Sequence, residues 1–264
     1  NISETAGGQS FKCRFAGVAI VPAIVINSTH MTCTTPAMHE TSAGTAKNSR
    51  VLLNQDLPAT VLVDVSSNGA QFFGCSGESQ KAAEFHYYDS IQLNSMTPRS
   101  GPHQGGTVLS IIGSGFLKSP RLACNVDGFW SPATFVSGSM VKCVVPPAKM
   151  YARIRTRGIV SVSNNGVNFA SSSRGTLSFM YHTRPVVEAI SPSFGSVAGG
   201  TSVMVQGSGF VRSSALACRF GTDVSDEVVF LSTTAILCTA PSGEGVETGF
   251  QSVSVSNNDL DYSN

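Results

Sequence analysis

The sequence predicts an all-β protein made of repeated β-sandwiches, and three observations support this prediction. Short runs rich in β-branched residues, such as "TVLSIIG", "ATVLVDVSS" and "GIVSVSNN", alternate with clusters of Gly, Pro, Ser and Asn. This pattern is typical of a sandwich of short strands. No segment has a convincing helical period, because the nearest candidate, "ESQKAAEF" at 78–85, is too short to be stable alone. The third observation is that the same motifs recur along the chain.

Three sets of motifs follow one another in the same order. Each set has two cysteines 19 or 20 residues apart, a proline three residues after the second cysteine, and a strand that ends in "VSSNG", "VSNNG" or "VSNND". The second and third sets also begin with a Gly-rich stretch, and these stretches start 94 residues apart, at Thr97 and Ser191. Repetition at this period indicates copies of one domain. We therefore predict repeat 1 over 1–93, repeat 2 over 94–187 and repeat 3 over 188–264.

The Gly-rich stretch reads "TPRSGPHQGGTVLSIIGSGF" in repeat 2 and "SPSFGSVAGGTSVMVQGSGF" in repeat 3, with nine of twenty positions identical. We expect the proline to start an edge strand, because its missing N–H is harmless there, and Gly101 to break that strand in two. Gly105 and Gly106 predict a tight turn with positive φ, and Phe116 is expected to fill the core. A phosphate-binding loop is excluded, because no Lys-Ser/Thr follows and the third glycine of a dinucleotide site is absent.

Repeats 1 and 3 are expected to be incomplete. Repeat 1 lacks the Gly-rich opening, and repeat 3 stops at its asparagine motif without a last strand. The alternative is a degenerate first domain and a naturally short third one, which would expose core and unpaired backbone. In repeat 1, Asn68 follows Cys33 by 35 residues, whereas Asn165 follows Cys143 by 22. Residues 39–56 are therefore predicted to form an added loop.

Taken together, these motifs resemble the IPT/TIG domain. The pattern "SPxxGxxxGGTxxxxxGSGF" is followed in repeat 3 by "CRFG", "CTAP" and "VSVSNN". The resemblance covers essentially the whole chain, as one complete and two partial copies. Such domains are immunoglobulin-like sandwiches of plexin and Met-type receptors, protist and algal surface proteins, some amylolytic enzymes and Rel-type transcription factors. The resemblance implies three tandem immunoglobulin-like sandwiches without catalytic residues, and it leaves a scaffold role and a binding role both open.

The cysteines predict an oxidising compartment, because a pair at one spacing in every repeat is typical of disulfides. The predicted bonds are Cys13–Cys33, Cys124–Cys143 and Cys218–Cys238. The alternative is three pairs of buried thiols in a cytosolic chain, and a zinc site lacks the Cys-x-x-Cys spacing. Asn27 and Asn1 begin N-glycosylation sequons, which favour the same secretory route.

A seventh cysteine, Cys75, is left over in "NGAQFFGCSGE", where the other repeats have no cysteine. A leftover cysteine in a secreted chain suggests a partner outside the segment. We predict a disulfide from Cys75 either to a cysteine in the missing N-terminal part of repeat 1 or to another chain. A free thiol is the alternative.

Charge and composition argue against several classes of function. Charged residues make up 12% of the chain and the net charge is +1, so no basic field is available for nucleic acid. No apolar run approaches the roughly 18 residues of a membrane span. The five histidines are scattered without a Ser/His/Asp or Cys/His arrangement, so no enzyme activity, metal or cofactor is expected. Asp259 and Asp261 have no supporting calcium-loop pattern.

Two features predict how the repeats meet their neighbours. The linkers "AEFHYYDSIQLNSMTP" and "LSFMYHTRPVVEAISP" are short and not Gly/Ser-rich, and their aromatic residues are available to pack at the joints, so a semi-rigid rod is favoured over flexible beads. On one strand, "ARIRTRG" would place three arginines on one face. This face is either solvated, or binds an anionic glycan, or sets the register between neighbouring chains, because repeat 3 carries acidic residues at the corresponding place. These residues are Arg153, Arg155 and Arg157, with Glu244 and Glu247 in the corresponding part of repeat 3.

The sequence favours a non-enzymatic segment of a longer extracellular or cell-surface glycoprotein, in which tandem domains form a semi-rigid stalk or fibre with a role in assembly. The alternative is an adhesion or receptor ectodomain of plexin or Met type that binds a protein or glycan, and a third class is an accessory domain of an enzyme. Expected partners are other protein chains and N-linked glycans, with no nucleic acid and no direct membrane insertion. Trp130, the only tryptophan, lies beside a predicted turn, and no aromatic cluster marks a binding hot spot.

Overall fold

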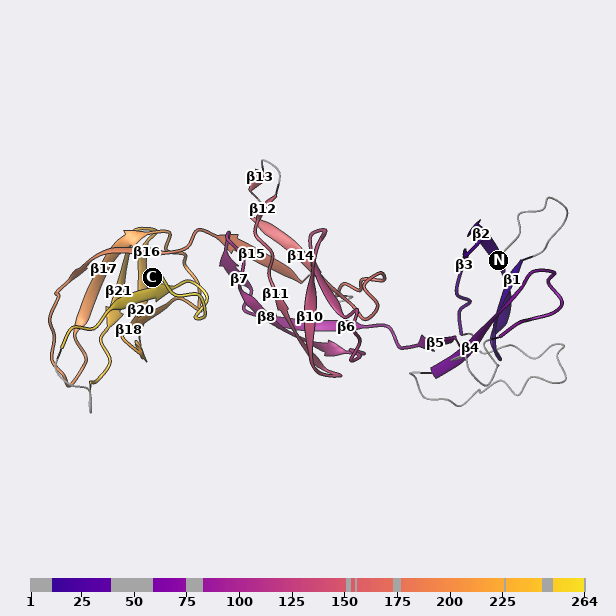
Figure 1. The fold of residues 1–264 in the computed structure, drawn as a ribbon. Coiled ribbons are helices and arrows are strands. Elements are labelled where there is room, and N and C mark those ends of the chain that lie inside the picture. The colour runs from indigo at the N-terminus through magenta and orange to yellow at the C-terminus, as the bar shows by residue number, and fades with distance from the viewer. Residues whose placement is uncertain are drawn as a thin grey trace. The chain divides into compact units, whose positions relative to one another are not determined.

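The computed structural model describes residues 11–38, 59–74, 83–150, 153–154, 156–172, 177–225, 227–243 and 249–263. These residues form strands, turns and irregular segments without a helix (Figure 1), which confirms the predicted all-β class. The chain divides into two compact units, Asn1–Asp89 and Ser90–Asn264, and each is described by itself. Most of repeat 1 lies in the first unit, and repeats 2 and 3 lie in the second.

Repeat 1 contains one antiparallel sheet with the strand order β3-β2-β1-β4-β5. Its strands are β1 (Lys12–Phe15), β2 (Ala19–Asn27), β3 (His30–Cys33), β4 (Ala59–Ser66) and β5 (Glu84–Tyr87). Successive side chains of a strand point to opposite faces of the sheet. On the inner face, Cys13, Phe15 and Val61 are buried and pack against Phe85 and Tyr87.

Repeat 2 is a sandwich whose strands follow the order β6-β8-β11-β10-β9-β14-β15-β7, with a separate β12-β13 pair. The first part of β10 pairs with β9 and the last part with β11, so the sheet folds over along this strand and encloses a core. Leu109, Ile111, Val141, Val160 and Phe179 are fully buried there. The strands are β6 (Gln92–Thr97), β7 (Ser100–Pro102), β8 (Val108–Ser114), β9 (Ala123–Val126), β10 (Phe129–Ser137), β11 (Met140–Val144), β12 (Lys149–Met150), β13 (Arg153–Ile154), β14 (Arg157–Ser163) and β15 (Ser178–His182).

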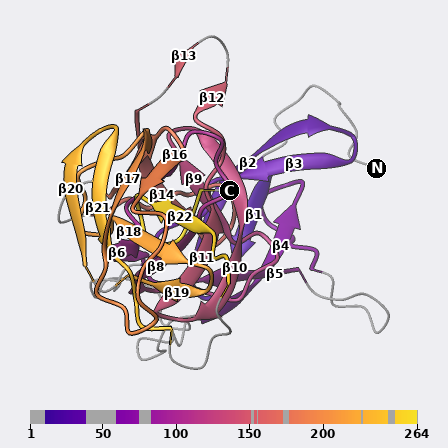
Figure 2. The same ribbon diagram turned by 90° about the vertical axis from the view of Figure 1, so that its left-hand side faces the viewer.

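Repeat 3 has two sheets, with the orders β16-β17-β21-β20 and β19-β18-β22, and Figure 2 draws its strands in orange and yellow. Val205, Ile236 and Val255 are fully buried in its core. Phe210 is 1% exposed and its counterpart Phe116 is 2% exposed, so both phenylalanines fill the core as predicted. The strands are β16 (Val186–Ser191), β17 (Ser202–Ser208), β18 (Ala217–Phe220), β19 (Asp223–Val224), β20 (Val228–Ser232), β21 (Ala235–Thr239) and β22 (Val253–Ser256).

The Gly-rich opening forms the predicted turn, but its strand break lies elsewhere than predicted. Gly105 has a φ of +74°, and a Cβ there would lie 2.7 Å from the Pro146 carbonyl carbon, so glycine is required. The prediction that the proline starts the edge strand is wrong. β6 ends at Thr97 and β7 begins at Ser100, so Pro98 lies in the break, because a residue without an N–H cannot donate to a sheet ladder.

Gly101 lies within β7 rather than at the break between strands. A Cβ on Gly101 would lie 2.7 Å from Cζ of Phe179, which is closer than real Cβ contacts. The glycine therefore allows β7 to pack closely against the core aromatic. β7 pairs in parallel with β15, with Gly101 opposite Tyr181, and this pairing completes one edge of repeat 2.

Candidate functional site

One disulfide bond lies inside each repeat. The bonds are Cys13–Cys33, Cys124–Cys143 and Cys218–Cys238, with Cα–Cα distances of 6.3, 6.1 and 6.1 Å. These distances lie within the range of ordinary disulfides. In repeats 2 and 3 all four cysteines are at most 2% exposed. Each bond therefore joins two strands through the core of its own repeat.

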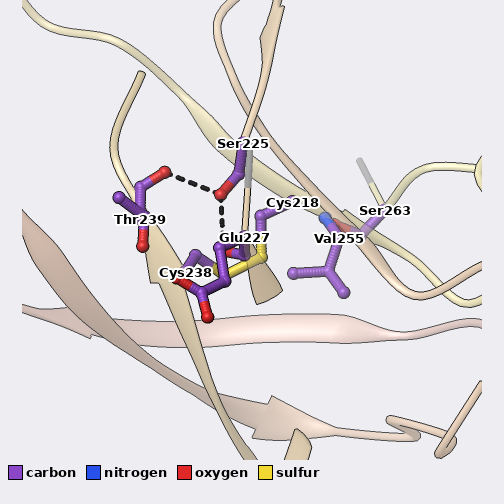
Figure 3. The surroundings of a disulfide bond; sticks show 7 residues. All are labelled: Cys218, Ser225, Glu227, Cys238, Thr239, Val255 and Ser263. Carbon is purple, nitrogen blue, oxygen red and sulfur yellow. Dashed lines mark hydrogen bonds between the residues drawn. A yellow bond between two sulfur atoms is a disulfide. The ribbon is translucent and has the colours of Figure 1, made fainter. Parts of the chain in front are cut away.

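The disulfide of repeat 3 is flanked by a buried serine that links two backbone segments (Figure 3). The Ser225 hydroxyl oxygen lies 2.8 Å from the Glu227 carbonyl oxygen and 2.6 Å from that of Thr239, and it donates its single proton to one of the two at a time. On the other side of the bond, the Val255 N–H donates to the Ser263 hydroxyl at 3.0 Å. The polar backbone around the buried sulfur atoms is therefore hydrogen-bonded, as burial requires.

The first asparagine of the "SNN" motif ties two distant motifs of a repeat together. In repeat 2, Asn164 donates from Nδ2 to the Gly115 carbonyl at 2.8 Å and accepts from the Leu117 N–H at 3.0 Å. In repeat 3, Asn257 makes the same pair of bonds to Gly209 and Val211 at 2.9 and 3.0 Å. "GSGF" and "SNN" therefore support each other, a link that the sequence analysis missed although both motifs were identified. In repeat 1 the corresponding residue is Ser67, which is exposed.

The second asparagine of the motif organises a turn, called here the asparagine turn (66–71, 163–168 and 256–261). Asn68 accepts at Oδ1 from two successive backbone N–H groups, at 2.9 Å each. Asn165 does the same at 3.0 and 2.8 Å, and Asn258 at 3.1 and 2.9 Å. In each turn the serine two residues earlier donates to the same oxygen. The turn is therefore defined by its own side chains.

The aromatic residues of the linkers pack inside their own repeats. The prediction that they pack at the joints is therefore wrong for Phe179 and Tyr181 in repeat 2 and for Phe85 and Tyr87 in repeat 1. Phe179 is fully buried, and the Tyr181 hydroxyl donates to the Pro146 carbonyl at 3.0 Å. Tyr87 makes the same bond to Pro36 at 2.9 Å. Both prolines lie three residues after the second cysteine. An aromatic ring buries more apolar surface in a core than at a joint, and the tyrosine hydroxyl can donate to a backbone carbonyl there.

Asn27 lies at the end of β2, exposed, at the hairpin that leads to β3. Its Oδ1 accepts from the Thr29 N–H, the Thr29 hydroxyl and the His30 N–H, each at 2.9 Å. These hydrogen bonds occupy Oδ1 of Asn27. The amide nitrogen, to which an N-glycan would be attached, therefore points away from Thr29 and His30. The sequon at Asn27 is therefore accessible, and its glycosylation stays a prediction.

The structure describes the backbone of two of the three arginines of the predicted stripe. Arg153 is in β13, which pairs with β12, whereas Arg157 is exposed and starts β14, which pairs with β9 and β15. The common face of the three arginines stays a prediction. The other residues of this proposed interface, and three further predicted features, lie outside the described residues: Arg155, Glu244, Glu247, Asn1, Cys75 and the loop at 39–56.

Repeat 3 has an apolar groove beside its Gly-rich opening, with a volume of about 430 Å³. Phe194, Val197 and Phe250 line it and are 84%, 60% and 109% exposed. The corresponding edge of repeat 2 is filled by β15, which pairs with β7 and β14. Trp130 is also exposed, at 68%, so the tryptophan is a surface residue and not part of the core.

Within the described part of the chain, no group of three His, Cys, Asp or Glu residues could hold a metal ion. The same residues contain no helix that is long and apolar enough to cross a membrane. Burial, together with the hydrogen bond to Asp259 at 2.8 Å, raises the pKa of Tyr262 to about 12. Tyr262 is therefore a neutral hydrogen-bond donor, and its ring lies 4.2 Å from the Arg219 guanidinium.

A sequence profile described as the IPT/TIG domain matches residues 92–179 and 185–264, which is more than half of the chain. The chain belongs to the IPT/TIG domain family. Fibrocystin-L of Mus musculus is 33% identical to it over 170 residues, which cover 61% of this chain and 4% of that protein. The chain therefore spans a small part of this relative.

Solved structures of other proteins are similar at low identity. A structure of the full extracellular region of plexin A4, with domains 1 to 8, has a TM-score of 0.38 and 17% identity, and the match covers 99% of this IPT/TIG chain and 30% of plexin A4. The bacterial integrin-binding protein invasin has a TM-score of 0.28 and 10% identity, and the match covers 94% of this chain and 49% of invasin.

Proposed function

We propose that this IPT/TIG chain is a non-enzymatic, extracellular segment of a larger cell-surface or secreted protein, and that its tandem repeats have a structural role in a stalk or fibre. The disulfide inside each repeat carries the proposal. Disulfides form and persist in oxidising compartments. A bond that closes a loop of this length contributes about 3 kcal/mol in the chain-entropy model, a large share of the stability of a domain of this size.

The test is the redox state of the cysteines in protein recovered from the cell surface or the medium. Peptide mapping without reductant is expected to recover the three bonds within the repeats. Fully reduced cysteines in protein taken directly from cells would contradict the proposal. Cytosolic expression of the same chain serves as the comparison, and it is expected to give a less stable protein.

Glycosylation of Asn27 would support the same secretory route. Asn27 lies exposed at a hairpin. Glycopeptide analysis of secreted protein is expected to find Asn27 modified, and Thr29→Ala is expected to abolish the modification. An unmodified Asn27 in secreted eukaryotic protein would remove this support.

Cys75 is proposed to form a disulfide with a cysteine outside the three repeat pairs. Alkylation of native protein without reductant is expected to leave Cys75 unlabelled. A dimer on non-reducing gels that Cys75→Ser abolishes would show an interchain bond. Quantitative labelling of Cys75 would show a free thiol and overturn the proposal.

Recognition of another protein chain is the second candidate function, and the outer face of β2 favours it. Ile20, Ile24 and Ile26 alternate along this strand and are 52%, 71% and 61% exposed. A row of exposed isoleucines is unusual on a soluble monomer and is typical of contact surfaces. Sedimentation of the parent chain and an Ile24→Ser/Ile26→Ser variant tests self-association through this face. A concentration-dependent mass that the substitutions remove is expected, and identical sedimentation would argue against it.

A further inference from the structure

The asparagine turn of repeat 3 contacts repeat 2 within the compact unit Ser90–Asn264. Asn258 donates from Nδ2 to the Ser100 carbonyl at 2.7 Å. The Thr107 hydroxyl donates to Oδ2 of Asp261, also at 2.7 Å. Ser100 and Thr107 belong to the Gly-rich opening of repeat 2. The two motifs that recur most clearly in the sequence therefore meet across the joint.

Hydrogen bonds inside the turn fix the orientation of the Asn258 amide that contacts repeat 2. Oδ1 of Asn258 accepts from the Leu260 and Asp261 N–H groups and from the Ser256 hydroxyl. Since these donors require an oxygen, the orientation of the amide is determined, and Nδ2 must point the other way. One Nδ2 proton bonds Oδ2 of Asp261 at 2.8 Å, and the other reaches Ser100. The amide thus links the turn and the joint in one network.

The hydrogen bonds between the asparagine turn of repeat 3 and repeat 2 involve buried side chains. Thr107 is 1% exposed and Asn258 is 5% exposed, and buried polar groups left without partners cost free energy. The Asp261 carboxylate accepts both bonds from neutral donors, and no Lys or Arg of the described residues forms an ion pair with it. The carboxylate therefore holds the joint through hydrogen bonds, which are stronger to a charged acceptor than to a neutral one.

The last strand of repeat 2 provides a further contact on the same side. His182, at the end of β15, lies 3.3 Å from Nδ2 of Asn257 through its Nδ1 atom. Asn257 is fully buried and is the residue that ties the motifs of repeat 3 together. These contacts between repeats 2 and 3 are polar, whereas the sequence predicts that aromatic residues pack at the joint.

We propose that the asparagine turn of repeat 3 is the docking element by which this repeat attaches to repeat 2. In this proposal Asn258 and Asp261 bind Ser100 and Thr107, so that repeats 2 and 3 move as one body. The partner surface is the Gly-rich opening, which presents the carbonyl of Ser100 and the hydroxyl of Thr107. The inference rests on the proposed structural role and specifies how that role is achieved between two neighbouring repeats.

The experiment compares two matched threonines in the full chain. Thr107→Val removes the hydroxyl that reaches Asp261. Thr201→Val is the control, because Thr201 occupies the same place in the opening of repeat 3 and no asparagine turn of the described residues bonds to it. Asp261→Ala removes the acceptor from the other side, and Asn168→Ala is its control in the turn of repeat 2.

Two measurements report on the joint separately from the fold. Residual dipolar couplings of the parent are expected to fit one alignment tensor for repeats 2 and 3, and those of Thr107→Val and Asp261→Ala are expected to require two. In Thr107→Val, hydrogen exchange at the Asp261 amide, in the other repeat, is expected to rise about tenfold, as for the loss of a bond to a charged group. Core amides are expected to keep parental exchange in every variant.

Independent alignment of the two repeats in the parent would overturn the proposal. Variants that keep one tensor and parental exchange at Asp261 would overturn it as well. If Thr107→Val unfolds repeat 2, Asp261→Ala still tests the contact from repeat 3. A flexible joint would leave the extracellular role intact, because the disulfide mapping tests that role independently.

Discussion

The asparagine turns of repeats 2 and 3 have the same internal hydrogen bonds but different surroundings. In repeat 2, Asn165 is half-buried and Asn168 is exposed, whereas in repeat 3 the corresponding Asn258 is buried and Asp261 is half-buried. The additional burial in repeat 3 comes from the Gly-rich opening of repeat 2. In repeat 3 a turn with locally determined geometry thus also serves as a contact surface for repeat 2.

The largest effect expected in either repeat is the loss of stability when its disulfide is removed. Replacing both cysteines by alanine in repeat 2 or in repeat 3 is expected to cost about 3 kcal/mol in either case. Repeat 3 is expected to suffer more in melting temperature, because its described core has 7 buried residues against 18 in repeat 2. Calorimetry of Cys218→Ala/Cys238→Ala and Cys124→Ala/Cys143→Ala measures both effects. Equal shifts would show that core size does not separate the repeats.

The first asparagine is expected to matter equally in both repeats. Asn164→Ala or Asn257→Ala leaves a half-buried glycine carbonyl and a backbone N–H without their partner, at a cost of about 2 kcal/mol. Ser67→Ala in repeat 1 is the control, and its exposed position predicts a change within about 0.5 kcal/mol. Hydrogen exchange of the strands in each repeat measures the loss. An Asn257→Ala variant as stable as the parent would contradict the tie between "GSGF" and "SNN".

The two opening glycines have different surroundings in repeats 2 and 3. A Cβ at Gly101 would lie 2.2 Å from the Thr107 hydroxyl oxygen and 2.7 Å from Cζ of Phe179, whereas the nearest atoms to a Cβ at Gly195 all belong to Thr201, at 2.7 Å or more. Gly101→Ala is therefore expected to destabilise by about 1–2 kcal/mol through overpacking, and Gly195→Ala by less. Urea unfolding of repeat 2 can be followed by hydrogen exchange of its buried strand amides. The reverse order of effects would show that β7 does not pack against the core as described.

A smaller, pH-dependent effect is expected at the joint of repeats 2 and 3. Burial lowers the pKa of His182, His103 adds to this lowering, and the Thr183 carbonyl and Asp261 oppose it. The folded state therefore favours the neutral imidazole. Above the ordinary pKa of 6.5 neither state is protonated and stability does not change. As the pH falls below that value, the unfolded chain takes up a proton before the folded one, so stability decreases.

His182→Gln is expected to flatten this pH dependence, and urea midpoints between about pH 7.5 and pH 5.5, on either side of the ordinary histidine pKa, provide the measurement. Tyr88 stands at the corresponding position of repeat 1, so the unfolding of repeat 1 is expected to lack this contribution. An unchanged slope in His182→Gln would assign the pH dependence to other groups.

Much of the fold could be predicted from short-range sequence features. Alternation of side chains predicts the strands, and Gly105 reveals its turn because only glycine adopts that backbone conformation without strain. Equal spacing in every repeat predicts the cysteine pairs. The proline was misplaced because its missing N–H is compatible both with the start of a strand and with the gap between two strands, and only the pairing of β6 and β7 decides between them.

The sequence by itself determined the β class, the order of the motifs and the turn at Gly105, because these depend on residues close together in the chain. Only the tertiary structure decided that Phe179 and Tyr181 lie inside repeat 2 and that Asn258 and Asp261 bind Ser100 and Thr107. The contacts of Asn258 and Asp261 with repeat 2 join residues about 160 positions apart. Local patterns show which side chains a turn presents, but the partner depends on which surface packing brings within hydrogen-bond distance.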